Sequence, residues 1–318
     1  MNASLPVSIA VSVLQVGAAI LGGPLLYGLM AKVRARAEGR AGAPIRQPLL
    51  DLRKLLVKER IHAATSSAVL PLAPLILAAT TAVAIAIAPL ISTAPALRSG
   101  ADVLVVVFLL LAGSVAVALA GLDAGTAFGG MGASRAMTIG ALAEPALLVA
   151  VIALSLQART SNLPGIVTAT LAHPQWVATP ERLLALLALL VVVIAETGRI
   201  PVDNPSTHLE LTMIHEAMVL EYAGPELALV TLAGMMRLWL LLSLVANLFF
   251  PWGIAQTAGA AHLAAGLVAL GAKTAAIAGV IAVLEVSMAK LRLFRVPEIL
   301  SGAFVLAVLA VVTGLVMP

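Results

Sequence analysis

The chain has no cysteine and little charge. Without cysteine it has no thiolate to ligate an iron–sulfur cluster or a zinc ion, and it cannot form a disulfide. We therefore do not expect the chain alone to carry electrons. Only 11% of its residues are charged, whereas a soluble domain has about 25%. The composition excludes an ordinary soluble globular fold.

The sequence is strongly apolar, since 61% of the 318 residues are hydrophobic. Continuous apolar runs of about 20 residues recur, and each can cross a hydrocarbon core roughly 30 Å thick. A β-barrel would instead alternate apolar and polar residues. The first run is long and lacks a basic start, so we interpret it as a span rather than a cleavable signal.

We predict an all-α, polytopic integral membrane protein, with residues 1–318 forming one membrane domain. No internal repeat is visible, and no segment is large enough for a separate soluble domain. The eight predicted spans are residues 5–31, 67–91, 101–122, 136–157, 180–198, 225–250, 262–288 and 297–317.

Lysine and arginine lie in alternate loops between these spans. Fourteen lie in loops on one side: Lys32, Arg34, Arg36, Arg40, Arg46, Arg53, Lys54, Lys58, Arg60, Arg135, Arg199, Lys290, Arg292 and Arg295. The opposite loops hold only Arg98, Arg159 and Arg182. The positive-inside rule places the basic loops in the cytoplasm and both chain ends outside, for a multi-pass protein of the inner (plasma) membrane. The net charge of +4 is then a topology signal, and we expect no nucleic-acid partner.

Two segments between spans suggest contacts with other surfaces. Residues 46–60, RQPLLDLRKLLVKER, place leucines on one helical face and basic residues elsewhere, which predicts an amphipathic helix at the cytoplasmic interface. This helix is either an anchor on the lipid surface or a docking ledge for a soluble partner. Residues 123–135, DAGTAFGGMGASR, are rich in glycine and small residues, and we expect a loop that approaches a partner or another loop closely.

The stretch from Ala195 to Gly224 concentrates charge between two apolar spans. Five of the chain's fifteen carboxylates fall here: Glu196, Asp203, Glu210, Glu216 and Glu221. We expect the stretch to lie at a membrane face and to fold back into the protein. A rigid turn at residues 201–205 is followed by a predicted short helix, with Thr207 and Glu210 as a capping box. Gly224 and Pro225 end that helix and open the next span.

Histidine spacing in this stretch does not predict a metal site. His208 and His215 are seven residues apart and can share a helical face. The two-histidine spacing of zinc proteases is absent, because Val219 stands where the second histidine would be.

Charged residues inside the predicted spans are the remaining candidates. Glu144 lies about two turns in from the cytoplasmic face, and Glu285 lies near the end of its span. Arg237 and Lys273 sit near the middle of theirs. Such groups are costly in lipid unless they are paired, protonated or hydrated. They either pair structurally, within this chain or with a neighbouring subunit, or form a polar path in which clustered carboxylates raise one another's pKa values.

Three motifs resemble a known family. They are QPLLDLRKLLVKE (Gln47 to Glu59), GMGASRAMTIGALAEPALL (Gly130 to Leu148) and the whole stretch from Ala195 to Gly224. Together they resemble the membrane subunit of respiratory complex I that bridges its hydrophilic and membrane arms. After Arg199, the sequence IPVDNPSTH is closer to the equivalent subunit of group 4 [NiFe] hydrogenases, such as formate hydrogenlyase and hydrogenase-4.

The resemblance implies a non-catalytic anchoring and energy-coupling subunit of an oxidoreductase complex in the respiratory chain. The implied partners are hydrogenase large and small subunits, a ferredoxin-like iron–sulfur subunit, antiporter-like membrane subunits and the lipid bilayer. The nickel–iron centre and iron–sulfur clusters would lie in those partners, and this chain would bind no cofactor.

The resemblance also implies a proton-translocation path along the acidic stretch. The residues that the resemblance assigns to it are Glu144, Glu196, Asp203, Glu210 and Glu221. By their positions in the chain we add Glu216 and Glu285 to the path, and Arg199, Arg237 and Lys273 as charge partners or parts of a polar path. Two alternatives remain at this stage. One is the quinone-site subunit of an NADH:quinone oxidoreductase, complex I itself. The other is a stand-alone secondary transporter, which the absence of an internal repeat disfavours.

Overall fold

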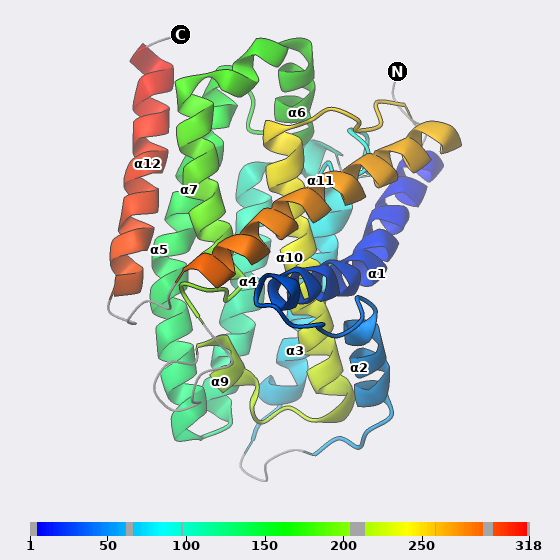
Figure 1. The fold of residues 1–318 in the computed structure, drawn as a ribbon, viewed down its shortest axis with the longest axis vertical. Coiled ribbons are helices and arrows are strands. Elements are labelled where there is room, and N and C mark those ends of the chain that lie inside the picture. Colours follow the sequence, from blue (N-terminus) through cyan, green and yellow to red (C-terminus); the bar gives the residue numbers. More distant parts are fainter. Residues whose placement is uncertain are drawn as a thin grey trace.

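The computed structural model describes residues 5–61, 66–96, 98–203, 214–257, 259–288 and 295–316, which form a helical bundle (Figure 1). The longer helices are α1 (Leu5–Ala37), α3 (Val69–Ile87), α4 (Val103–Asp123), α5 (Ala127–Ala158), α7 (Pro180–Glu196), α10 (Gly224–Phe249), α11 (Ala260–Ser287) and α12 (Val296–Val316). No strand occurs in these ranges. The predicted all-α membrane fold is confirmed.

Seven of these eight helices are long and apolar enough to cross a membrane, by length and composition. The exception is α7, which has 17 residues. Each predicted span coincides with one of the eight helices, but the number of crossings stays a prediction. The first and last described helices have their free ends at the same end of the bundle (Figure 1), as an even number of crossings requires.

The shorter helices divide between the two ends of the bundle. Helices α2 (Gln47–Leu56) and α9 (His215–Val219) lie at the end away from the termini, and α6 (Leu163–Ala172) lies at the end near them (Figure 1). Short 3₁₀ turns, η1 (Arg98–Gly100) and η2 (Pro174–Ala178), complete the described elements.

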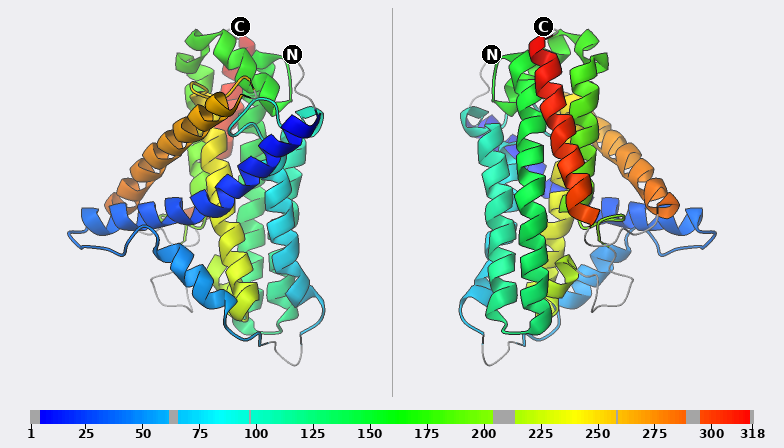
Figure 2. Two further views of the ribbon diagram at one scale, coloured as in Figure 1. Left: turned by 90° about the vertical axis from the view of Figure 1, so that its right-hand side faces the viewer. Right: turned by 90° about the vertical axis from the view of Figure 1, so that its left-hand side faces the viewer.

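Helix α10 is the centre of the packing. Of its most apolar stretch, 78% is buried, against 28% for α1 and α11 and 22% for α12. Helices α3, α4, α5, α12 and α7 pack side by side in that order. Helices α1 and α11 cross the bundle obliquely (Figure 2). Helix α1 also bends, and it contains Pro24, whose ring removes a backbone hydrogen bond and kinks a helix.

The glycine-rich segment at residues 123–135 is mostly helix, not the expected loop. Helix α5 begins at Ala127, after Thr126 caps it by accepting a hydrogen bond from the Gly129 backbone N–H at 3.2 Å. A Cβ at Gly129 would lie 2.3 Å from the Gly121 carbonyl oxygen on α4. The small residues therefore allow close helix–helix approach, as they do between membrane helices.

Candidate functional site

A cavity of about 450 Å³ opens inside the bundle, lined by residues of α1 to α5, α7, α9 and α10. Its lining includes four of the carboxylates singled out from the sequence: Glu144, Glu196, Asp203 and Glu216. Asp51 on α2 adds a fifth carboxylate, and Arg199 and Arg237 add two guanidinium groups. Carboxylates from separate segments of the chain thus share one hollow.

Glu196 and Arg237 form a buried ion pair at this cavity. Glu196 ends α7, and Arg237 lies in the middle of α10, with their side chains 8% and 9% exposed. The Arg237 guanidinium also donates to the Ser114 hydroxyl at 2.7 Å and to the Leu110 carbonyl at 3.3 Å, both on α4. One charged hydrogen-bond network therefore ties three helices together around the cavity.

Glu144 presents a carboxylate oxygen that the described residues leave unsatisfied. Its Oε1 is buried and has no hydrogen-bond partner among them. A buried polar atom without a hydrogen-bond partner costs free energy, so this carboxyl group lowers the stability of the folded chain. A group that gains or loses a proton, or that meets water in the cavity, fits that position.

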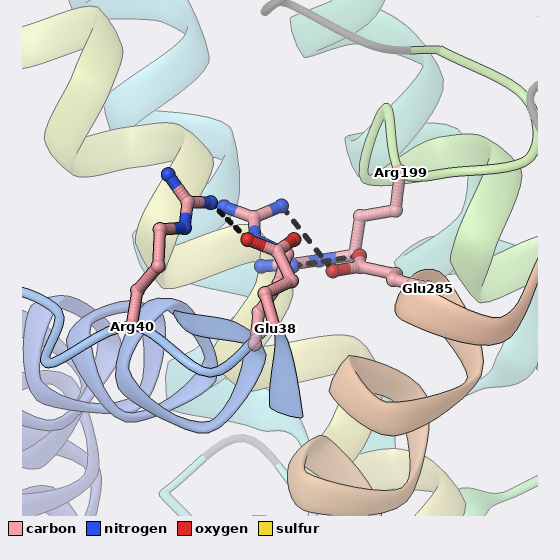
Figure 3. Close-up of polar contacts among 5 residues, drawn as sticks. Glu38, Arg40, Arg199 and Glu285 are labelled. Carbon is pink, nitrogen blue, oxygen red and sulfur yellow. Dashed lines mark hydrogen bonds and ion pairs between the residues drawn. The ribbon is translucent and has the colours of Figure 1, made fainter. Parts of the chain in front are cut away.

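A second charged cluster lies beside the cavity (Figure 3). Glu285 on α11 accepts a hydrogen bond from Arg199 at 3.0 Å and one from Arg34 at 3.4 Å. Arg199 also lies over the ring of Tyr27, 5.4 Å from its centroid, in a cation–π contact. Glu285 does not line the cavity. It holds Arg199 in place and thereby fixes the turn that follows α7.

Asp203 and His215 meet where this turn reaches α9. Asp203 is 3% exposed, and its Oδ2 accepts the backbone N–H groups of Ile214 at 3.3 Å and His215 at 3.2 Å. The same oxygen lies 3.4 Å from His215 Nδ1. Gly198 makes room for the imidazole ring, because a Cβ there would lie 2.8 Å from Nδ1.

Glu216 follows directly and is accessible from the cavity. The protein atoms around it raise the pKa of its carboxyl group by desolvation, and the negative charge of Asp203 raises that pKa further, against a smaller lowering by His215. Protonation of Glu216 is thereby favoured at a higher pH than for a free glutamate.

Other predicted site residues do not join this cluster. Glu221 is not among the cavity-lining residues, and Glu210 and His208 lie outside the described residues. Lys273 donates to the Asn247 amide oxygen at 2.6 Å and to the Phe250 carbonyl at 3.0 Å, and no described carboxylate pairs with it. The Asn247 amide in turn donates to the Pro89 and Leu90 carbonyls beyond the end of α3. The Lys273 ammonium therefore binds at the C-terminal end of α10, where a cation is favourable.

Some residues that line the cavity or are buried in the bundle are not predicted as such from the sequence. Asp51 lies on the predicted amphipathic helix, and the sequence does not indicate that it joins the acidic cluster. The leucines on the neighbouring face of that helix are the signal that could have shown it. His215 was weighed only as a metal ligand. Arg182 was counted as a loop charge, yet it is fully buried and donates to Gln157, Thr170 and the Leu248 carbonyl.

The chain is similar to known proteins over most of its length. A model of the family described as NADH dehydrogenase matches residues 9–316. Hydrogenase-4 component C of Escherichia coli (strain K12) is 32% identical over 287 residues, covering 90% of each chain. Formate hydrogenlyase subunit 4 of the same strain is 29% identical over 290 residues, covering 91% of this chain and 93% of the relative.

The fold is also similar to a solved structure. It superposes with a TM-score of 0.84 on a chain of the membrane-bound sulfane sulfur reductase, an archaeal respiratory membrane complex, covering 96% of this chain and 99% of that one. The two sequences are 20% identical, so this likeness speaks for the fold alone.

Proposed function

Because the chain belongs to the NADH dehydrogenase family and is a membrane subunit of a hydrogenase- or complex I-like respiratory complex, we propose that it couples redox chemistry in soluble partners to proton movement. The cavity that gathers Glu144, Glu196, Asp203 and Glu216 is the observation that carries this proposal. Redox change in a neighbouring subunit would alter the local charge or the position of the acidic stretch. The coupled carboxylates would then take up or release protons together.

The anchoring part of the proposal rests on the end of the bundle that holds α2 and α9. Leu52 on α2 packs inward against Ala228 and Met235 of α10, so α2 rests on the protein through this leucine. Beyond α2, Val57 and Ile61 are 84% and 68% exposed. Exposed apolar side chains beside basic ones fit a protein docking surface, which favours the docking ledge over the lipid-surface anchor.

The soluble partners proposed here are hydrogenase large and small subunits and a ferredoxin-like iron–sulfur subunit. The named relatives are components of hydrogenase-4 and of formate hydrogenlyase, which supports hydrogenase partners. The nickel–iron centre and the iron–sulfur clusters are proposed to lie in those partners, and this chain is proposed to be non-catalytic.

The proposed path leaves the chain sideways. Between the cavity and the terminus end, apolar side chains such as Val107, Leu147 and Leu244 surround a void of only about 20 Å³. The side chains around this void offer no polar group to carry a proton, so protons are proposed to pass laterally to antiporter-like membrane subunits. This packing also disfavours a stand-alone transporter.

Glu144→Gln and Glu196→Gln variants of the intact complex test the path. Each variant keeps the size of the side chain and removes its titration. We expect the complex to assemble and turn over with artificial electron donors, while turnover-linked proton movement in membrane vesicles falls by about a hundredfold or more, the lower end of the range for a lost proton-transfer group.

Glu298→Gln is the matched control, because the Glu298 side chain is 70% exposed and lies away from the cavity. It is expected to behave as the parent chain. Normal assembly and normal turnover-linked proton movement in both cavity variants would contradict the proposed path.

A second function is favoured by the apolar part of the cavity lining. Leu52, Met137 and Met235 line the same hollow as the carboxylates, and a volume of about 450 Å³ is in the range of small-molecule sites. A quinone headgroup is therefore the alternative occupant. Purification of the complex in mild detergent separates the two: nickel with hydrogen evolution identifies the hydrogenase type, and iron without nickel plus quinone reduction identifies the quinone type.

A further inference from the structure

His215 occupies a position at the cavity that the carboxylates do not explain. It is the first residue of α9, it lines the cavity, and its side chain is 40% exposed. The carboxylates of its neighbours Asp203 and Glu196 are only 4% and 8% exposed. The imidazole is therefore more exposed than the carboxylates of Asp203 and Glu196, and with the exposed Glu216 it is one of two accessible titratable groups on α9.

The contacts around the ring fix its orientation from two sides. Nδ1 faces Asp203 Oδ2 at 3.4 Å, and the ring packs on Gly198, which has a φ of +59° and no Cβ in the way. Among the described residues, Nε2 has no protein partner. A histidine oriented through Nδ1 by a carboxylate leaves Nε2 available for proton exchange, as in catalytic His–Asp pairs.

Charged groups of both signs lie around His215. The cavity lining supplies five carboxylates and two guanidinium groups: Asp51, Glu144, Glu196, Asp203, Glu216, Arg199 and Arg237. Helix α9 also packs on α4 and α5, which carry Asp123, bound to the Ser67 backbone N–H at 2.8 Å, and Arg135. The ring also packs against Gly198, which lies just beyond the C-terminal turn of α7.

We propose that His215 is the port through which protons pass between the solution and the carboxylates of the cavity, with Asp203 as its positioning residue. This inference rests on the proposed function and names the residue at which the path begins. Nε2 takes a proton from water at the mouth and gives it to water or a carboxylate inside. Nδ1 keeps its proton toward Asp203 throughout, so one proton enters and one leaves.

The test uses vesicles that contain the whole membrane complex, with proton movement per turnover followed from about pH 5 to 8, where imidazole titrates. His215→Gln keeps a polar side chain near Asp203 but cannot titrate. We expect its proton movement to fall by about a hundredfold or more and to lose the pH dependence seen in the parent chain. His262→Gln is the matched control, because His262 is exposed at the start of α11, and it should behave as the parent chain.

Chemical rescue separates a proton port from a structural role. Free imidazole should restore proton movement in His215→Ala and should leave Glu144→Gln unchanged. A loss in His215→Gln with an unaltered pH profile, and without rescue of His215→Ala, would overturn the port. Normal coupling and an unaltered pH profile in His215→Gln, with Glu144→Gln deficient, would also overturn it and leave the proposed function standing. Normal coupling in both would overturn both.

Discussion

The pairing of Glu196 with Arg237 shows how a single buried interaction holds the cavity together. Arg237 donates to Glu196, Ser114 and the Leu110 carbonyl, so its guanidinium satisfies polar groups on two other helices. Removing one partner of a buried pair leaves an uncompensated charge, which costs more than the pair itself contributes.

Arg237→Met is therefore expected to destabilise the chain by about 3–5 kcal/mol. The double variant Arg237→Met with Glu196→Gln should recover much of this loss, because no isolated carboxylate remains. Denaturant unfolding of the purified chain in detergent measures both. The control is Arg295→Met, since Arg295 and Glu298 are 66% and 70% exposed and 3.7 Å apart and such pairs contribute about 0–1 kcal/mol. A loss in Arg237→Met no larger than in the control contradicts the expectation.

The sequence identified several of the buried charges, but not Arg182, and not the groups that they meet. Arg237 and Lys273 looked equivalent, each a cation near the middle of a span. Arg237 pairs with a carboxylate, whereas Lys273 binds an amide oxygen and a carbonyl at helix ends. The difference depends on the rotation and tilt of each helix, which are set by packing and not by hydropathy. Glu285 was expected to join the acidic path, and the structure pairs it with Arg34 and Arg199 beside the cavity.

At the scale of elements, Gly224 is where the acidic stretch meets the start of α10. Its φ is +57°, and a Cβ there would lie 2.5 Å from the Glu59 carbonyl oxygen. The left-handed conformation costs a non-glycine residue about 1–2 kcal/mol, and the backbone contact adds to that. Gly224 therefore lets the segment after α2 pass directly over the first turn of α10.

Gly224→Ala is expected to lower the unfolding free energy by more than about 1 kcal/mol. Gly302→Ala is the matched substitution, since Gly302 lies inside α12 and an added methyl group there would meet no atom within 4 Å. It should stabilise the chain by up to about 1 kcal/mol through helix propensity. The melting temperatures of the two variants should shift in opposite directions. Equal shifts would contradict the expectation and show that the backbone at Gly224 accommodates a methyl group without strain.

Element positions were largely predictable, whereas the roles of some segments were not. Long apolar runs gave helices at all eight expected places, because burial in lipid requires both apolar side chains and internally satisfied backbone. The stretch at residues 123–135 was misinterpreted, since glycine is common both in loops and at close helix contacts. Helix α6 was not expected, because its ten apolar-rich residues are too few to signal a span.

At the scale of the whole molecule, the two ends of the bundle differ in charge, and this difference predicts the orientation of the chain in the membrane. The α2–α9 end of the bundle carries the acidic turn of the cavity and most of the basic loops. The turn η1 lies at the opposite end, near the termini, where the Asn162 amide donates to the Arg98 carbonyl at 2.6 Å beside the start of α6. The positive-inside rule puts the α2–α9 end in the cytoplasm. The proposed soluble partners require the same orientation, so a single labelling experiment bears on both.

The absence of cysteine makes that experiment clean, because the parent chain gives no thiol background. Val57→Cys places a thiol at an 84% exposed site beyond α2, and Ser99→Cys places one in the exposed turn η1. A membrane-impermeant maleimide should label Ser99→Cys in intact cells and Val57→Cys only in inverted vesicles. The reverse pattern would place the cavity mouth outside the cytoplasm, beyond reach of a cytoplasmic redox module, and would contradict the coupling role together with the orientation. Labelling of both sites from one side would instead show that the chain does not cross the membrane between them, or crosses it an even number of times, and would contradict the assignment of α3 as a single span.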